Sequence, residues 1–156
     1  MKTVALIALT SSDRGQTIHL AKINRMHIDE KYVEFYITER IKTTGRILFP
    51  TTIRCVSSLE ESKDVAKYVL HYMEKTLPYR DETSQQLFIS HTTYKPVCRN
   101  TIARWLKKVL HLAGIDTSIF KAHSYRGASL SHAFNKGAPI EDITKAGNWK
   151  KIFHIF

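Results

Sequence analysis

The sequence predicts a mainly α protein that carries one small antiparallel β-meander of three strands, an α+β arrangement. Between residues 26 and 53 the apolar positions mostly alternate with polar ones at a period of two, and two turn signals interrupt the alternation. Outside this stretch, apolar residues mostly recur at the spacing of three and four residues that is typical of helices. The length of 156 residues fits a single domain with its own core.

Two short helices are expected at the start of the chain. The apolar run Val4–Leu9 predicts a buried helix, which Ser11, Ser12 and Asp13 interrupt. A second helical pattern follows over residues 14–22. The opening residues imitate a secretory signal, but the apolar run is short and no small-residue cleavage site follows it. We therefore interpret it as a core helix.

The meander is expected to consist of three short strands. Residues 26–28 form the first, and residues 32–38 alternate as the second after the turn-like residues 29–31. Gly45 marks the second turn, and the third strand is predicted over Ile47–Ile53. Consecutive short strands joined by such turns pair as antiparallel neighbours.

Helices are expected after the meander. The pattern Ser58-x-x-Glu61 is typical of a capping box and predicts a helix start, and Pro78 is expected to end that helix. The inward positions of this helix, which share helical spacing, are Val65, Val69, Tyr72 and Met73.

Three more helices complete the prediction. One runs over Asn100–Ala113, with its first residue as the N-cap and Gly114 as the stop. Another covers residues 123–136 and stops at Gly137, and a short one covers residues 139–147.

The chain is strongly basic. Lys and Arg outnumber Asp and Glu by 24 to 14, which gives a formal net charge of +10. A basic domain of this size indicates a polyanionic partner, most often nucleic acid, and the alternative is a basic protein without such a partner. Cys55 and Cys98 form no C-x-x-C motif, so no zinc or redox site is expected. Two free thiols in a reducing compartment are expected, with a single disulfide as the alternative. No apolar run approaches the roughly 18 residues of a membrane span.

The segment KAHSYRGASL places His123 and Arg126 three residues apart, on one face of a predicted helix. An imidazole and a guanidinium so placed form either a solvated surface pair or a joint grip on a phosphate. Three other residues stand at informative positions: Arg14 at a break between helices, Lys42 just before the second turn of the meander, and Trp149 near the end. Taken singly, these three have ordinary interpretations as a helix-start arginine, a solvated lysine and a core tryptophan.

Taken in order, these five residues resemble the catalytic domain of the tyrosine recombinases, the phage-integrase family. SSDRGQTIHLAKI is similar to the family's first arginine box, RIKTTG to its hairpin lysine, HSYRGAS to its HxxR box and KAGNWKK to its histidine-or-tryptophan position. The stretch QLFISHTTYKPVCRNTIARWLKKVLHLAGID resembles the recombinases of DIRS-type retrotransposons. The resemblance covers nearly the whole chain and implies the family's fold, without the N-terminal core-binding domain that most members carry.

The resemblance also implies a chemistry that needs no metal and no cofactor. A tyrosine attacks a DNA phosphodiester, forms a 3′-phosphotyrosine, and the strand is later rejoined. Arg14 and Arg126 would flank the phosphate and stabilise the charge of its five-coordinate transition state. His123 would shuttle the tyrosine's proton, Lys42 would protonate the departing 5′ oxygen, and Trp149 would pack against the site and donate its indole N–H.

Contact with double-stranded DNA is expected from the outward face of the helix that follows residue 99. That face is basic and is expected to enter a major groove, so binding should weaken steeply with salt. The alternative is a solvated helix face. The expected DNA-contacting residues are Arg99, Asn100, Arg104 and Lys108.

Two departures from the family pattern stand out. Thr17 occupies the position, three residues after the first arginine, where the family usually carries an acidic residue that supports the arginine box. The nucleophilic tyrosine should follow Trp149 by roughly nine or ten residues, which lies beyond Phe156, and none of the seven tyrosines stands there. We therefore expect a C-terminally truncated catalytic domain that is inactive as this fragment.

Several hypotheses remain open. The first is the catalytic domain of a mobile-element recombinase, with a type IB topoisomerase-like relaxase as a variant that uses the same chemistry. The second is a DNA-binding relic of a mobile element without chemistry, and the third is a basic helical adaptor for RNA or an acidic protein. Family members work as tetramers on DNA, whereas this fragment is expected to be a monomer. It is expected in the nucleus if the source is a eukaryote and otherwise in the cytoplasm, and it is not expected to be secreted.

Overall fold

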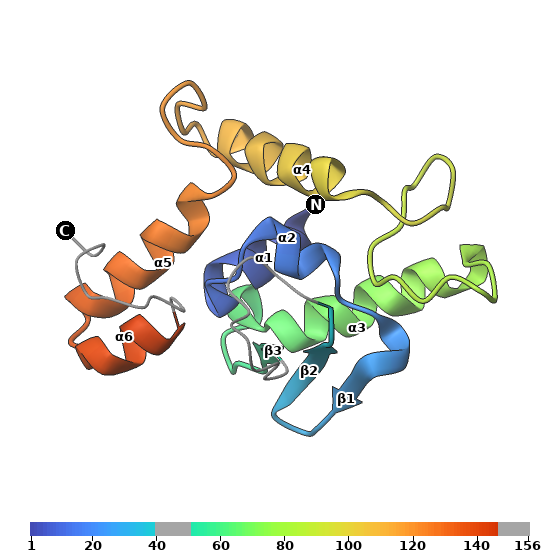
Figure 1. Ribbon diagram of the computed structural model, residues 1–156, viewed down its shortest axis with the longest axis horizontal. Coiled ribbons are helices and arrows are strands. Elements are labelled where there is room, and N and C mark those ends of the chain that lie inside the picture. Colours follow the sequence, from blue (N-terminus) through green and yellow to red (C-terminus); the bar gives the residue numbers. More distant parts are fainter. Residues whose placement is uncertain (40–50, 147–156) are drawn as a thin grey trace.

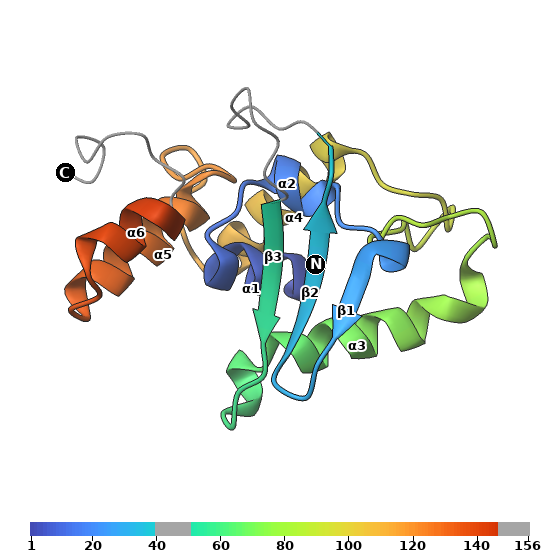
Figure 2. The same ribbon diagram turned by 60° about the horizontal axis from the view of Figure 1, so that its bottom comes forward.

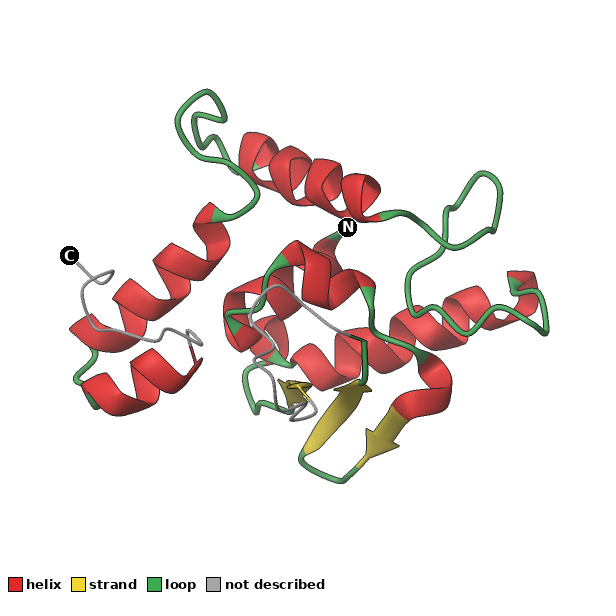
Figure 3. Cartoon of the chain, viewed as in Figure 1, coloured by secondary structure: helices red, strands yellow, loops and turns green. Residues whose placement is uncertain are grey.

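The computed structural model describes residues 1–39 and 51–146. Lys42, Gly45 and Trp149 therefore lie outside the described residues, as do the first part of the predicted third strand and Gly147. In the described part, helices dominate and the strands are confined to one small sheet (Figure 3). This arrangement confirms the predicted fold class.

The helices and strands follow one another as the sequence pattern indicates (Figure 1). In chain order the described elements are α1 Lys2–Ser11, α2 Gly15–His19, η1 Ile23–Arg25, β1 Met26–Ile28, β2 Tyr32–Ile37, β3 Thr51–Val56, η2 Glu61–Lys63, α3 Val65–Thr76, η3 Leu77–Tyr79, α4 Arg99–Leu112, α5 Ser124–Asn135 and α6 Ile140–Ala146.

Helix α1 lies at the centre of the molecule. It contacts α3, α4, α5 and strand β3, so it is covered on several sides. Its sequence suits this position, because a helix that is apolar around most of its circumference must be buried. The side chains that it buries are Thr3, Val4, Ala5, Ile7 and Ala8.

The sheet has the strand order β1-β2-β3, with both pairs antiparallel, and α3 lies across one end of it (Figure 2). Opposite Val33 lies Cys55, and opposite Phe35 lies Ile53, so these residues share one buried face. Contacts of α3 with β2 and β3, and of α1 with β3, bury that face. Helices α5 and α6 pack together at the end of the molecule away from β1 and the C-terminal part of α3 (Figure 1).

Several element boundaries differ from the prediction by one to three residues. Helix α2 ends at His19 and not at residue 22. In the described part, β3 begins at Thr51 and continues to Val56, beyond the predicted end at Ile53. Asn100 is not the N-cap of α4, because the helix already includes Arg99 and its cap position is Cys98.

The predicted capping box of α3 is wrong. The side chain of Asp64 caps the helix, since its Oδ1 accepts from the backbone N–H of Lys67 at 2.9 Å. Ser58 Oγ instead accepts from the N–H of Glu60, and Glu61 begins a single turn of 3-10 helix. Serine and aspartate side chains can both act as an N-cap. Only Asp64 lies next to the first turn of α3, so only its side chain reaches the unpaired N–H groups of that turn.

Replacing Asp64 by Ala is therefore expected to lower the free energy of unfolding by about 1 kcal/mol, because an orphan N–H of α3 loses its acceptor. Ser58→Ala is the matched control and should change stability by less than about half as much. Urea unfolding followed by circular dichroism measures both values. Equal losses in the two variants would contradict the assignment of the cap.

Candidate active site

A cavity of about 480 Å³ brings together three segments that are far apart in the sequence. They are the junction of α1 and α2, the first turn of α4, and the start of α5. The residues that line it are Asp13, Arg14, Gly15, Gln16, Arg99, Asn100, Ala103, Ala122, His123 and Arg126.

The backbone on either side of Arg14 is fixed by contacts with α4 and α5. Helix α1 ends at Ser11, and its C-cap residue Ser12 adopts a left-handed conformation with φ 55°. The buried Ser12 places its Oγ 2.8 Å from Oγ of Ser129 on α5. The carbonyl of Arg14 accepts the N–H groups of Thr17 and Ile18, and α2 packs against α4. Arg14 is thus held at the N-cap position of α2, where it lines the cavity.

The start of α5 presents His123 and Arg126 to the same cavity. His123 is the N-cap residue, and its carbonyl accepts the N–H of Arg126 at 3.3 Å, so the two residues share the first turn. Tyr125 lies between them in sequence and points the opposite way. Its hydroxyl donates to the carbonyl of Leu106 at 3.1 Å, which fastens α5 to α4.

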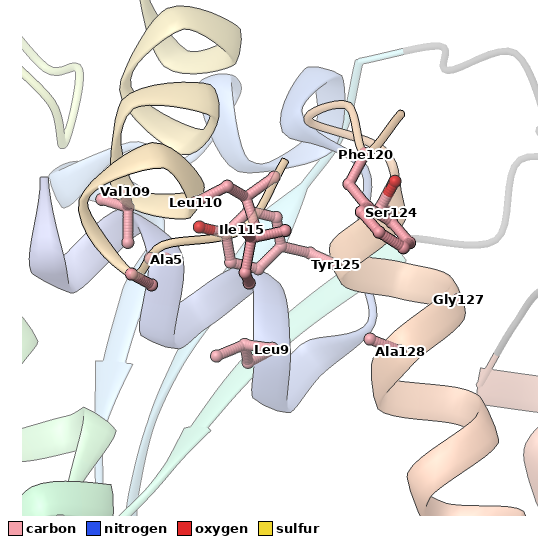
Figure 4. A pocket seen from close by; sticks show the side chains of 11 residues that line it. Ala5, Leu9, Val109, Leu110, Ile115, Phe120, Ser124, Tyr125, Gly127 and Ala128 are labelled. Atoms are coloured by element: carbon pink, nitrogen blue, oxygen red, sulfur yellow. The ribbon is translucent and has the colours of Figure 1, made fainter. Parts of the chain in front are cut away.

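A second cavity, of about 670 Å³, lies between α1, α4 and α5 (Figure 4). Tyr125 points into it together with Leu9 and Val109, and most of its lining is apolar. It offers no cationic side chain among its lining residues. An anionic ligand therefore finds favourable partners in the first cavity and none in the second.

In the first cavity, the charges of Arg14, Arg126 and Asp13 influence the pKa values of Arg126 and Asp13. Partial burial lowers the pKa of Arg126, and the neighbouring Arg14 lowers it further, while Asp13 raises it. Burial raises the pKa of Asp13 to about 6, although a hydrogen bond with Ser11 and the charges of Arg126 and Arg14 oppose the increase. Two guanidinium groups and one carboxyl group thus influence one another across the cavity.

Asp13 was not among the residues that the sequence nominated. It follows a serine pair at a helix break, which predicts a capping residue. The signal available in the sequence was its position next to Arg14, but its burial depends on the packing of α1 against β3 and α5.

The four residues expected to contact DNA divide into two groups. Arg99 and Asn100 line the cavity. Arg104 and Lys108 do not line it and are exposed farther along α4, where an Nη of Arg104 donates to Oγ1 of Thr101 at 3.2 Å.

All seven tyrosines lie in the described part of the chain, and none lines the cavity. Tyr125 is buried and is hydrogen-bonded to α4. The hydroxyl of Tyr72 donates to the carbonyl of Ile89, and Tyr79 and Tyr94 stack on each other with ring centroids 4.7 Å apart. In residues 1–39 and 51–146, no cluster of three or more His, Cys, Asp or Glu side chains is placed to hold a metal ion. No helix of the described part is long and apolar enough to cross a membrane.

Comparison with protein families decides which group the chain falls into. Residues 2–155 match the model of the phage integrase family, which is nearly the whole sequence. The chain belongs to the phage integrase family. This finding supports the resemblance to tyrosine recombinases that the arginine, histidine and lysine motifs indicated. No curated protein matches the sequence significantly.

The fold of this phage integrase domain is similar to that of solved recombinases at low sequence identity. A structure of XerA recombinase has a TM-score of 0.70 and 17% identity, over 99% of this chain and 50% of that one. XerH site-specific recombinase bound to palindromic difH substrate, in a post-cleavage complex, has a TM-score of 0.71 and 10% identity, over 97% and 39%. A lambda integrase dimer bound to a COC′ core site has a TM-score of 0.61 and 12% identity, over 96% and 39%. The chain spans half or less of the length of these proteins.

The raised pKa of Asp13 predicts how stability changes with pH. The folded protein holds this proton up to about pH 6, whereas an ordinary aspartate releases it near 3.8. The stability that the neutral carboxyl confers is therefore complete below about pH 3.8 and is lost as the pH rises through about 6. At roughly 1.4 kcal/mol per pKa unit, the loss is at most about 3 kcal/mol.

Asp13→Asn keeps the shape of the carboxyl and removes its charge, so the variant should gain stability relative to the wild type between about pH 5 and about pH 8. Urea unfolding at both pH values measures this difference. Asp29→Asn, on the exposed β1–β2 turn, is the matched control and should follow the wild type. A constant difference between Asp13→Asn and the wild type at both pH values would contradict the prediction.

Proposed function

We propose that this domain binds a DNA phosphodiester and is the catalytic core of a site-specific tyrosine recombinase, the family of enzymes that cleave and rejoin strands in DNA integration and recombination. One observation carries the proposal: Arg14, His123 and Arg126, which are up to 112 residues apart in the chain, line a single cavity. The neighbouring XerH and lambda integrase structures are described as complexes with DNA, which supports the choice of ligand.

The chemistry that the cavity supports is stabilisation of developing negative charge. A phosphodiester under attack becomes five-coordinate and gathers charge on its non-bridging oxygens. Arg14 and Arg126 provide fixed, permanently charged donors with the planar geometry that fits two phosphate oxygens. Because these charges are in place before the substrate binds, they stabilise the transition state without reorganisation.

His123 is exposed at the rim of the cavity, one turn from Arg126, and histidine exchanges protons near neutral pH. We assign it the transfer of the proton of the attacking hydroxyl. Lys42 and Trp149 are proposed to complete the site, as the resemblance implies, with Lys42 protonating the leaving 5′ oxygen and Trp149 offering its indole N–H.

The DNA is proposed to lie along α4 on its way to the cavity. Arg99 and Asn100 at the start of the helix contact the bound phosphate region, and Arg104 and Lys108 contact neighbouring phosphates or base edges. The formal net charge of +10 supports a long-range attraction to the duplex.

The 156-residue polypeptide is proposed not to cleave DNA by itself, since no tyrosine lines the cavity. The same observation favours the second candidate function, a DNA-binding relic of a mobile element that performs no chemistry. The resemblance of residues 86–116 to DIRS-type retrotransposon recombinases supports a mobile-element origin, and with it a nuclear location in a eukaryote. A monomer is proposed for this polypeptide, and a tetramer on DNA for full-length relatives.

Removal of either arginine of the cavity should weaken DNA binding. We expect Arg14→Gln and Arg126→Gln each to reduce affinity for a 30-base-pair duplex by about tenfold, because a charge-assisted phosphate contact is worth roughly 1–3 kcal/mol. Lys67→Gln, at an exposed position of α3 that does not line the cavity, removes the same charge and is the matched control. Fluorescence anisotropy measures the affinities, and equal values for all three variants would contradict the proposed site.

The same assay tests the path along α4. The logarithm of the affinity should fall linearly with the logarithm of the salt concentration. The slope should correspond to the neutralisation of several phosphates. Arg104→Gln and Lys108→Gln should each reduce this slope by about one. A salt-independent affinity, or stronger binding to RNA than to duplex DNA, would favour the adaptor hypothesis instead.

Covalent chemistry separates the two candidate functions. The 156-residue chain should give no protein–DNA adduct on denaturing gels after incubation with a nicked duplex. A C-terminal extension that supplies a tyrosine about nine or ten residues after Trp149 should restore the adduct, and Arg126→Gln in that extended chain should reduce the rate by about a hundredfold or more. An adduct with the unextended chain contradicts the proposed inactivity, and a folded extended chain that never reacts indicates the relic.

A further inference from the structure

Asp13 is the only carboxyl group among the described residues that line the cavity. Three arginines and one histidine line the same space. Thr17, at the position where an acidic residue was expected, is buried and does not line the cavity. The cavity therefore contains an acidic group, but this group lies on the other side of Arg14 in the sequence.

The arginines need such a group when no phosphate is bound. Arg14 and Arg126 line the same cavity, where the charge of Arg14 disfavours the charged form of Arg126, so the two guanidinium groups repel each other. The charge of Asp13 acts on Arg126 in the opposite sense, and both arginines favour the ionised form of Asp13. The carboxylate thus offsets the mutual repulsion of the pair.

We infer that Asp13 is a positioning residue that takes the place of the acidic partner absent at Thr17, holds Arg14 and Arg126 together in the empty cavity, and takes up a proton when a phosphodiester enters. The first part rests on the family pattern at Thr17, and the second on the charges around the cavity. The last part rests on the proposed function, because it needs a bound phosphate.

The proton uptake follows from the sum of charges around Asp13. Burial raises the pKa of Asp13 to about 6 even though Ser11, Arg126 and Arg14 act to lower it. A phosphodiester adds a negative charge to the cavity, and a like charge disfavours the ionised carboxyl further. The other titratable neighbours are His123 and Arg99, which line the cavity, and Cys55 on β3. Burial, and secondarily the charge of Asp13, raises the pKa of Cys55 to about 12, so it stays a neutral thiol.

The pairing is tested without DNA. The ¹³Cγ resonance of Asp13, assigned by its loss in Asp13→Asn, reports the titration of its carboxyl group. In Arg14→Gln and in Arg126→Gln the pKa of Asp13 should rise by roughly one pH unit each, whereas the Lys67→Gln control should leave it unchanged. An unchanged pKa in both arginine variants overturns the positioning role, and does so whether or not the protein binds DNA.

The proton uptake is tested with a 30-base-pair duplex by calorimetric titration near pH 7 in buffers of different ionisation enthalpy. To confine the measurement to Asp13, it is made in a His123→Asn background, with and without Asp13→Asn. The Asp13 protein should take up more protons on binding than the Asp13→Asn protein, by roughly half a proton or more. Asp29→Asn in the same background should match the Asp13 protein.

Each outcome has one meaning. Equal uptake by two proteins that both bind the duplex overturns the proton-linked part of the inference. If the arginine variants raise the pKa of Asp13 but the wild-type protein does not bind duplex DNA, the proposed function fails and the positioning role stands. Asp13→Glu, which keeps the charge on a longer side chain, should retain part of the coupling to both arginines, and a complete loss would contradict a charge-based role.

Discussion

The site depends on one electrostatic constraint: two guanidinium groups must lie near each other before any phosphate arrives to separate them. Like charges repel, so the backbone that carries them has to be fixed by contacts that do not involve the arginines. Ser12 and Ser129 join the end of α1 to α5, and the hydroxyl of Tyr125 joins α5 to α4. These polar contacts, together with the packing of α2 on α4, set the positions of Arg14 and Arg126.

The first turn of α5 directs its proposed phosphate-binding side chains and its packing side chain to different sides of the helix. His123 and Arg126 are three residues apart and share a face, while Tyr125 points away from that face because successive residues in a helix are about 100° apart. The opposite direction is occupied by an apolar cavity between α1, α4 and α5 (Figure 4). Tyr125 lies within the HxxR segment, but its hydrogen bond to the carbonyl of Leu106 makes it a structural group that fastens α5 to α4.

Periodicity predicted most of the fold because it is a local property. The alternation in residues 26–37 and the helical spacing in residues 65–76 correspond to strands and a helix in the structure. Caps were less predictable, because Ser58, Asp64 and Asn100 all have side chains that can accept from a helix N-terminus, and only the tertiary path of the chain selects one of them. The convergence of Arg14 with Arg126 was expected from the family resemblance and not from any local pattern.

The environment of Asp13 depends on tertiary packing and could not be predicted from the neighbouring sequence. The sequence context of Asp13 is a polar helix break, which indicates a capping side chain, yet the fold partly buries it near two arginines and Cys55. Two opposing effects act on a partly buried carboxyl near cations: desolvation favours the neutral acid, and the arginines favour the carboxylate. Here desolvation is the larger effect, so the group is poised between its two states near pH 6. A site that binds an anion gains from such a group, because the negative charge that steadies the empty arginine pair can be neutralised by one proton when the phosphate replaces it.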